Sequence, residues 1–148
     1  LYLSPETLGF GEWIGIAVRT MIRCIDRHIS IGKAELVNNA AISKGVMQTL
    51  EGEGGKSAVF EEVQEGLLAV AAIFGQADFT ELDEDALDAA GEFLNCINGL
   101  YASAQSQKGT SLELLPPEFI ENDKKVISGK ICCIPIFIKD KELKFMIF

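Results

Sequence analysis

The sequence contains a single histidine, few positive charges and no hydrophobic run of the ~20 residues that a membrane-spanning helix needs. Its 13 lysines and arginines face 22 aspartates and glutamates, which leaves a net charge of −9. Nucleic-acid-binding domains need a basic surface, and anionic membranes attract basic segments. The composition therefore argues against nucleic-acid binding and against membrane association. The first residues also lack the basic segment of a secretory signal peptide.

Ligands for a metal ion and partners for disulfides are equally scarce. The four cysteines are Cys24, Cys96, Cys132 and Cys133, and no two of them have the C-x-x-C spacing. With His28 as the one histidine, the ligand set of a zinc site is missing. We therefore expect free thiols in a reducing cytoplasm, no metal site and no cofactor of the protein's own. Cys96 is expected to be a small buried residue, since no basic group stands near it in the sequence.

A hydrophobic content of 48% in 148 residues is typical of one globular domain with a substantial core. We expect a single domain over residues 1–148, with an irregular N-terminal segment at 1–9. Because the chain lacks an initiator methionine, a fragment of a longer protein is an alternative that stays open.

Hydrophobic periodicity predicts helices followed by strands, in two successive groups. A first amphipathic helix is predicted over residues 10–27 and a short one from Val63 to a glycine cap at Gly75. A long helix should begin after capping candidates at residues 80–83 and run to about Gln107, with Gly109 as the stop signal. Strands are predicted at 29–37, 45–50, 56–61, 110–115, 124–128, 130–139 and 142–148, while 38–43 is ambiguous.

The most informative pattern lies on one face of the long helix. Asp88, Glu92, Asn95 and Gly99 stand at i, i+4, i+7 and i+11, which places them on one stripe. The opposite stripe is apolar and can face a core; it contains Leu87, Ala90, Leu94, Ile97 and Tyr101. We therefore expect Glu92 and Asn95 to be exposed side by side. From this spacing alone, an ordinary solvated helix face is the simpler interpretation.

A carboxylate and an amide one turn apart limit the chemistry that such a face can perform. An amide does not titrate near neutral pH, but its oxygen and NH2 group can orient a water molecule. A carboxylate can hold a cation or a lysine of a partner. No serine, cysteine or histidine completes a nucleophile–base pair on this face. The site could therefore act only on a substrate that is already activated, by positioning.

The string Asp88-x-x-x-Glu92-x-x-Asn95, followed by Gly99 and by Pro116-Pro117, resembles the CheC/CheX/FliY family of chemotaxis phosphatases, and CheX most closely. The resemblance extends over residues 44–148 and more loosely over 9–37. It implies an α+β, CheC-like fold, an antiparallel sheet with helices packed on one face. It also implies hydrolysis of the aspartyl phosphate on a CheY-like response-regulator receiver domain.

The resemblance also implies roles for individual residues. Glu92 would bind a lysine of the receiver domain, and Asn95 would hold a water in line with the phosphoryl group. Asp88 and Gly99 would support them, and the receiver would carry its own Mg2+. The family is built from a duplicated unit, but the first helix here has Glu12-Trp13-Ile14-Gly15, with glycine where the amide should be. We therefore expect one active motif per chain.

Leu100 and the shorter spacing from Asn95 to the prolines depart from the family pattern and leave the exact partner open. A non-catalytic CheX-like binding or regulatory module in two-component signalling is the alternative function. An exposed amide on Asn95 favours the enzyme, whereas an amide tied into the fold favours the binding module.

The apolar C-terminal strands at 130–139 and 142–148 suggest a homodimer, because a long apolar edge needs pairing.

Overall fold

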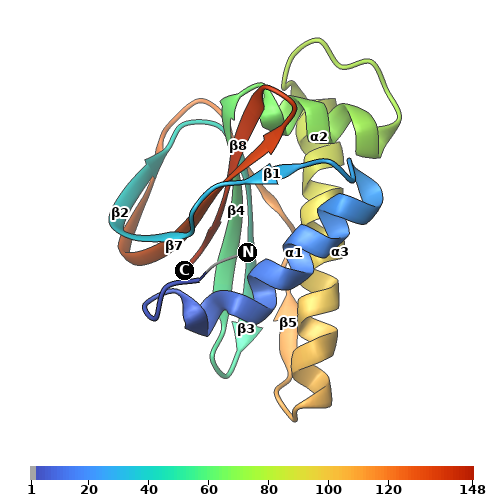
Figure 1. Cartoon of the computed structure of the whole chain (residues 1–148). Coiled ribbons are helices and arrows are strands. Elements are labelled where there is room, and N and C mark those ends of the chain that lie inside the picture. The colour runs from blue at the N-terminus through green and yellow to red at the C-terminus, as the bar shows by residue number, and fades with distance from the viewer. Residues whose placement is uncertain (1–2) are drawn as a thin grey trace.

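In the computed structural model, which describes residues 3–148, eight strands form one antiparallel sheet and three α-helices cover one of its faces (Figure 1). The helices are α1 (Gly11–Cys24), α2 (Gly66–Gly75) and α3 (Glu84–Gln107), with a short 3-10 helix at Leu8–Phe10 before α1. The strands are β1 (Ser30–Ile31), β2 (Glu35–Ile42), β3 (Gly45–Gly52), β4 (Lys56–Gln64), β5 (Leu112–Leu114), β6 (Glu118–Ile120), β7 (Lys125–Ile138) and β8 (Lys141–Ile147). The predicted α+β class is confirmed.

The order of the strands places β3 near one end of the sheet. The path runs β1-β7-β8-β4-β3-β5, with β2 paired to β7 and β6 paired to β3. Both β5 and β6 therefore lie against the same strand, β3, at different points along it. This arrangement brings the segment between β5 and β6 to the edge of the sheet that lies beside α3.

Two apolar clusters hold the layers together. The larger one lies between the helices and the sheet and includes Trp13, Leu87, Phe93 and Phe145. The smaller one lies on the other face and includes Ile42, Val59, Ile127 and Met146. It is enclosed by the sheet itself, since β2 and the first half of β7 curl away from the helices as an arm (Figure 1).

Helix α3, which carries the motif, begins and ends where the sequence predicts. Asp83 is the N-cap, and its carboxylate accepts a hydrogen bond of 3.0 Å from the backbone N–H of Ala86. Acidic residues in the first turn suit the positive end of the helix dipole. After Gln107 the chain turns at Gly109, whose φ of +87° is accessible to glycine at little cost. The buried stripe of the helix packs against the sheet, so Asp88, Glu92 and Asn95 on the opposite stripe are exposed to solvent.

The predicted limits of α2 are wrong at both ends. Strand β4 continues to Gln64, and the helix begins only at Gly66, where a Cβ would lie 2.2 Å from the backbone of Glu142. The carboxylate of Glu62 takes the place of an N-cap side chain by accepting the backbone N–H groups of Leu67 and Leu68. The left-handed cap is Gln76, with a φ of 52°, and not Gly75. Tertiary contact with β8 decides the start of this helix, which local periodicity does not reveal.

Two strand predictions also need correction. The predicted strands at 124–128 and 130–139 form one strand, β7, because Gly129, at a φ of +99°, donates its backbone N–H to Asn39 across the ladder. The predicted strand at 29–37 is divided between the two-residue β1 and the beginning of β2, and the ambiguous segment 38–43 contributes most of β2. A bulge at Asn39 shifts the register of β2 on β7 and bends the arm.

No helix within residues 3–148 has both the length and the apolar character needed to cross a lipid bilayer.

Candidate functional site

An open cavity of about 360 Å³ lies between α3 and the segment that joins β5 to β6. Helix α3 contributes Asp88, Gly91, Glu92 and Asn95 to it, and the opposite wall contains Pro116, Pro117 and Phe119. Three of the four predicted site residues therefore line one cavity. Gly99 does not line it; a Cβ added at this position would meet nothing within 4 Å.

The proline wall follows from the way in which β5 and β6 share β3 as a partner. Proline has no backbone N–H to donate, so the ladder on β3 is interrupted at Pro116 and Pro117. Gly91 allows this wall to approach α3, because its Cα faces Pro117 and an added Cβ would lie 3.3 Å from the proline Cβ. The glycine that lowers the helix propensity of α3 therefore has a packing reason.

The carboxylate of Glu92 is exposed and unpaired. Among residues 3–148, the one ion pair joins Lys108 to Glu12, neither of which lines this cavity, and Glu92 takes part in no ion pair. Asp88, one turn before Glu92, is also exposed and adds a second negative charge to the same rim. The cavity therefore presents an acidic edge that can receive a cationic side chain.

The amide of Asn95 is exposed, but one end of it is held. Its Oδ1 accepts a hydrogen bond of 2.7 Å from Nε2 of Gln48 on β3. No hydrogen bond from its Nδ2 forms within the described part of the chain. The side chain is thus tied to the fold through its oxygen, while its NH2 group and one oxygen lone pair remain available to a ligand.

Cys96 is exposed, so its predicted burial is wrong. It stands four residues after Glu92 and therefore lies on the same side of α3, away from the apolar stripe. Loss of solvent contact raises the pKa of the Cys96 thiol above its usual value, and the neighbouring Cys24 and Glu92 raise it further. A thiol held in its protonated form is a poor nucleophile. Within residues 3–148, no cluster of three or more potential metal ligands is present.

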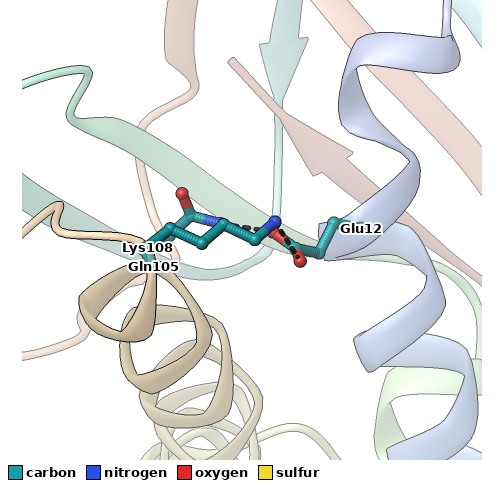
Figure 2. Close-up of polar contacts among 3 residues, drawn as sticks. All are labelled: Glu12, Gln105 and Lys108. Carbon is teal, nitrogen blue, oxygen red and sulfur yellow. Dashed lines mark hydrogen bonds and ion pairs between the residues drawn. The ribbon is translucent and has the colours of Figure 1, made fainter.

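Glu12, the glutamate of the first helix that the sequence pattern aligns with Glu92, is paired within the chain. Figure 2 shows the carboxylate of Glu12, on α1, held by two residues at the end of α3, Gln105 and Lys108. The Lys108 ammonium lies 2.7 Å from Glu12 Oε2 and lowers the pKa of that carboxyl. Glu12 is therefore paired within the chain, and the residue three positions later, Gly15, has no amide side chain. One active motif per chain stays our prediction.

Sequence reasoning missed the residues behind and opposite the motif. Gln48 and Asn98 are completely buried polar residues, and Phe119 forms part of the far wall. A signal for Gln48 was available, since alternation along β3 places it on the same side as Val46 and Leu50, which face the core. A glutamine at an inward position of an apolar strand must find hydrogen-bond partners.

The model of one protein family, described as chemotaxis phosphatase CheX, matches residues 45–142, well over half of the chain. This protein belongs to the CheX family. The matched residues include all of α3 and both walls of the cavity. A search of curated proteins finds no significant match.

Solved structures of the wider family share the fold. A CheX protein from Desulfovibrio desulfuricans superposes with a TM-score of 0.75 at 19% identity, over 94% of this chain and 97% of that one. CheX in a CheX–CheY–BeF3–Mg2+ complex from Borrelia burgdorferi gives 0.74 at 19%, over 93% and 95%. FliY from Thermotoga maritima gives 0.61 at 19%, over 99% and 91%. At these identities the likeness demonstrates the CheC-like fold of this CheX-family protein.

Proposed function

We propose that this protein hydrolyses the aspartyl phosphate of a CheY-like response-regulator receiver domain. The observation that carries the proposal is the pair of exposed side chains, Glu92 and Asn95, one turn apart in an open cavity of a CheX-family chain. Neither side chain is a nucleophile or a general base with a partner. The pair suits a substrate whose phosphoryl group is already activated as a mixed anhydride.

Glu92 would dock the receiver domain. Its carboxylate is exposed and has no cationic partner among the described residues, so a lysine of the receiver can approach it without displacing another group. Asp88 on the same rim would strengthen the attraction for a cation and support Glu92. Gly99 stays the candidate for a close approach of the partner's backbone, since the space above it is open.

Asn95 would position the attacking water. Its amide can hold a water in line with the scissile bond, and the cavity around it is open to an incoming domain. The protein would need no cofactor of its own, because the receiver domain would bring Mg2+. The Borrelia burgdorferi complex contains Mg2+ and BeF3 together with CheY, which supports this assignment.

The alternative, a binding module without catalysis, depends on whether the Asn95 amide is free. The oxygen accepts a hydrogen bond of 2.7 Å from Gln48, which favours a structural role, but the NH2 group has no hydrogen-bond partner among residues 3–148, which favours the enzyme. A dephosphorylation assay separates the two functions. A receiver domain from the same genome, phosphorylated with a small phosphodonor, should lose phosphate faster when the protein is added. Stable binding with an unchanged rate of phosphate loss would identify the binding module.

The turnover rate is expected to change little between about pH 6.5 and 8.5. An amide does not titrate in this range, and carboxyl groups ordinarily titrate below about pH 5. The raised pKa of Cys96 keeps its thiol protonated near neutrality. The measurement is the turnover rate for a phosphorylated receiver at each pH, after subtraction of the receiver's own loss of phosphate. A bell-shaped profile within this range would show that a general acid or base had been overlooked.

A homodimer remains our prediction for the oligomeric state, although its original basis is wrong. Strand β8 is paired with both β4 and β7, and the apolar part of β7, from Cys132 to Ile138, is paired with β8 and lies inside the sheet, so these segments offer no apolar edge. Among the described strands, β1, β2, β5 and β6 each pair with one other strand, and β2 is the longest of these edge strands. Two copies could meet along this edge. Light scattering at micromolar concentration should give twice the 16.1 kDa mass of one chain; a single-chain mass would contradict the prediction.

A further inference from the structure

We propose that a buried chain of hydrogen bonds sets which end of the Asn95 amide meets the substrate, and that Gln48 is the positioning residue that transmits this choice. The inference rests on the proposed phosphatase function and adds residues that touch neither the receiver domain nor the phosphoryl group. It concerns orientation rather than binding, because Gln48 lies beneath the cavity and not in its lining.

The chain of hydrogen bonds begins on α1 and ends at Asn95. Nε1 of Trp13 donates to Oδ1 of Asn98 at 3.0 Å, and Nδ2 of Asn98 donates to Oε1 of Gln48 at 2.8 Å. Nε2 of Gln48 then donates to two acceptors, the backbone carbonyl of Leu115 at 2.8 Å and Oδ1 of Asn95 at 2.7 Å. The hydrogen bonds thus connect the first helix, strand β3 and the proline segment to the exposed amide on α3.

The groups at the two ends of this chain of hydrogen bonds determine which atom of each amide donates and which accepts. An indole N–H can only donate, so Asn98 must present its oxygen to Trp13 and its NH2 group to Gln48. A backbone carbonyl can only accept, so Gln48 must present its NH2 group to Leu115. Both constraints require the same orientation of the Gln48 amide. Asn95 therefore turns its oxygen inward and its NH2 group outward.

Burial makes this direction costly to reverse. Trp13 is 1% exposed, and Gln48 and Asn98 are completely buried. Within residues 3–148, every buried side-chain nitrogen and oxygen has a hydrogen-bond partner. Turning over either buried amide would place oxygen against oxygen or leave a polar group without a hydrogen bond. In the protein interior, an unpaired polar group costs free energy of folding. The stack of Trp13 on Tyr101, with ring centroids 4.1 Å apart, holds the indole in place.

The consequence for the reaction is a fixed hydrogen-bond donor at the cavity. The outward NH2 group can donate to a phosphoryl oxygen or to the attacking water, and the remaining lone pair of Oδ1 can accept from that water. A free asparagine samples three χ1 wells and two amide orientations. The hydrogen bond from Gln48 holds Asn95 in one of these arrangements before the receiver binds. The amide is therefore preorganised for the transition state.

The test replaces the donor without touching the cavity. In Gln48→Met, the apolar side chain keeps a similar length but cannot hold Asn95. The turnover rate for a phosphorylated receiver should fall about tenfold, in line with the lost selection among side-chain arrangements. The dissociation constant for the beryllofluoride-activated receiver should stay within about twofold, since Glu92 is unchanged. Gln48→Glu offers a second variant of nearly the same shape whose carboxylate accepts where the amide donates, and it should lower turnover in the same way.

A matched control lies at the next position of β3. Thr49 bonds Ser57 through its side chain at 3.0 Å on the opposite face of the strand. Thr49→Val should leave both turnover and receiver binding unchanged. Unchanged turnover in a folded Gln48→Met protein would overturn the proposal, and so would a loss of binding equal to the loss of turnover.

A measurement on the unmodified protein keeps the proposal independent of the enzyme assay. The side-chain NH2 group of Asn95 should show the 15N relaxation of a rigid group, with the exposed Asn122 as an internal mobile reference. An Asn95 amide as mobile as that of Asn122 would refute the positioning chain. A rigid Asn95 amide in a protein that does not dephosphorylate any receiver would instead refute the proposed function and leave the chain standing.

Discussion

Asn95→Ala is expected to abolish the acceleration of receiver dephosphorylation, with a loss of about a hundredfold or more. Removing one preorganised hydrogen-bonding group from a transition state commonly costs a factor of this size. The protein should still bind the receiver, because Glu92 and the proline wall are untouched. Phosphate loss from a phosphorylated receiver measures the first effect. Titration of the beryllofluoride-activated receiver measures the second.

A matched control for this variant is Asn122→Ala, which makes the same change at an exposed site between β6 and β7. It should retain full activity. Full phosphatase activity in Asn95→Ala would show that the amide does not position the water. Loss of receiver binding together with activity would show that Asn95 contributes to docking of the receiver and not to the chemical step.

Glu92→Lys is expected to weaken receiver binding by about thirtyfold or more. Truncating or reversing one partner of a charge pair at an interface typically costs 2–5 kcal/mol, and here a positive charge would meet the receiver's lysine. The weaker binding should be measurable by titration with beryllofluoride-activated receiver. At saturating receiver concentrations, part of the turnover should return, because Asn95 is still in place.

The control for Glu92→Lys must change the net charge equally at an exposed site that does not line the cavity. Glu113→Lys, on β5, also moves the net charge from −9 to −7, since each change removes one negative and adds one positive charge. Glu113 is exposed and lies outside the cavity. Equal weakening by both variants would mean that long-range attraction alone guides the receiver. Unaltered binding in Glu92→Lys would place the receiver elsewhere on the surface.

Much of this molecule could be predicted from local pattern. Helix α3 has a strong periodicity, an aspartate cap and a glycine stop, and it was predicted with its limits. The exposed positions of Glu92 and Asn95 follow from the apolar stripe opposite them, since a helix anchored on one side must expose the other. These features depend on residues within a few turns of one another.

Features that depend on distant segments escaped prediction. No residue near Gly66 indicates that the start of α2 packs against the backbone of Glu142. The bulge of β2 at Asn39 and the continuation of β7 through Gly129 involve a hydrogen bond between two residues that are 90 positions apart in the sequence. Each of these outcomes is decided by a neighbour that is remote in sequence.

The sequence by itself determined the family, the α+β class and the two side chains that the proposed reaction requires, because spacing along one helix is a local property. The tertiary structure decided what surrounds them. It placed the proline segment across from α3, paired Glu12 with Lys108 while leaving Glu92 unpaired, and put Gln48 under Asn95. The orientation of an amide depends on which donors and acceptors meet it in three dimensions. Here they come from α1, β3 and the β5–β6 segment, which only the folded sheet brings together.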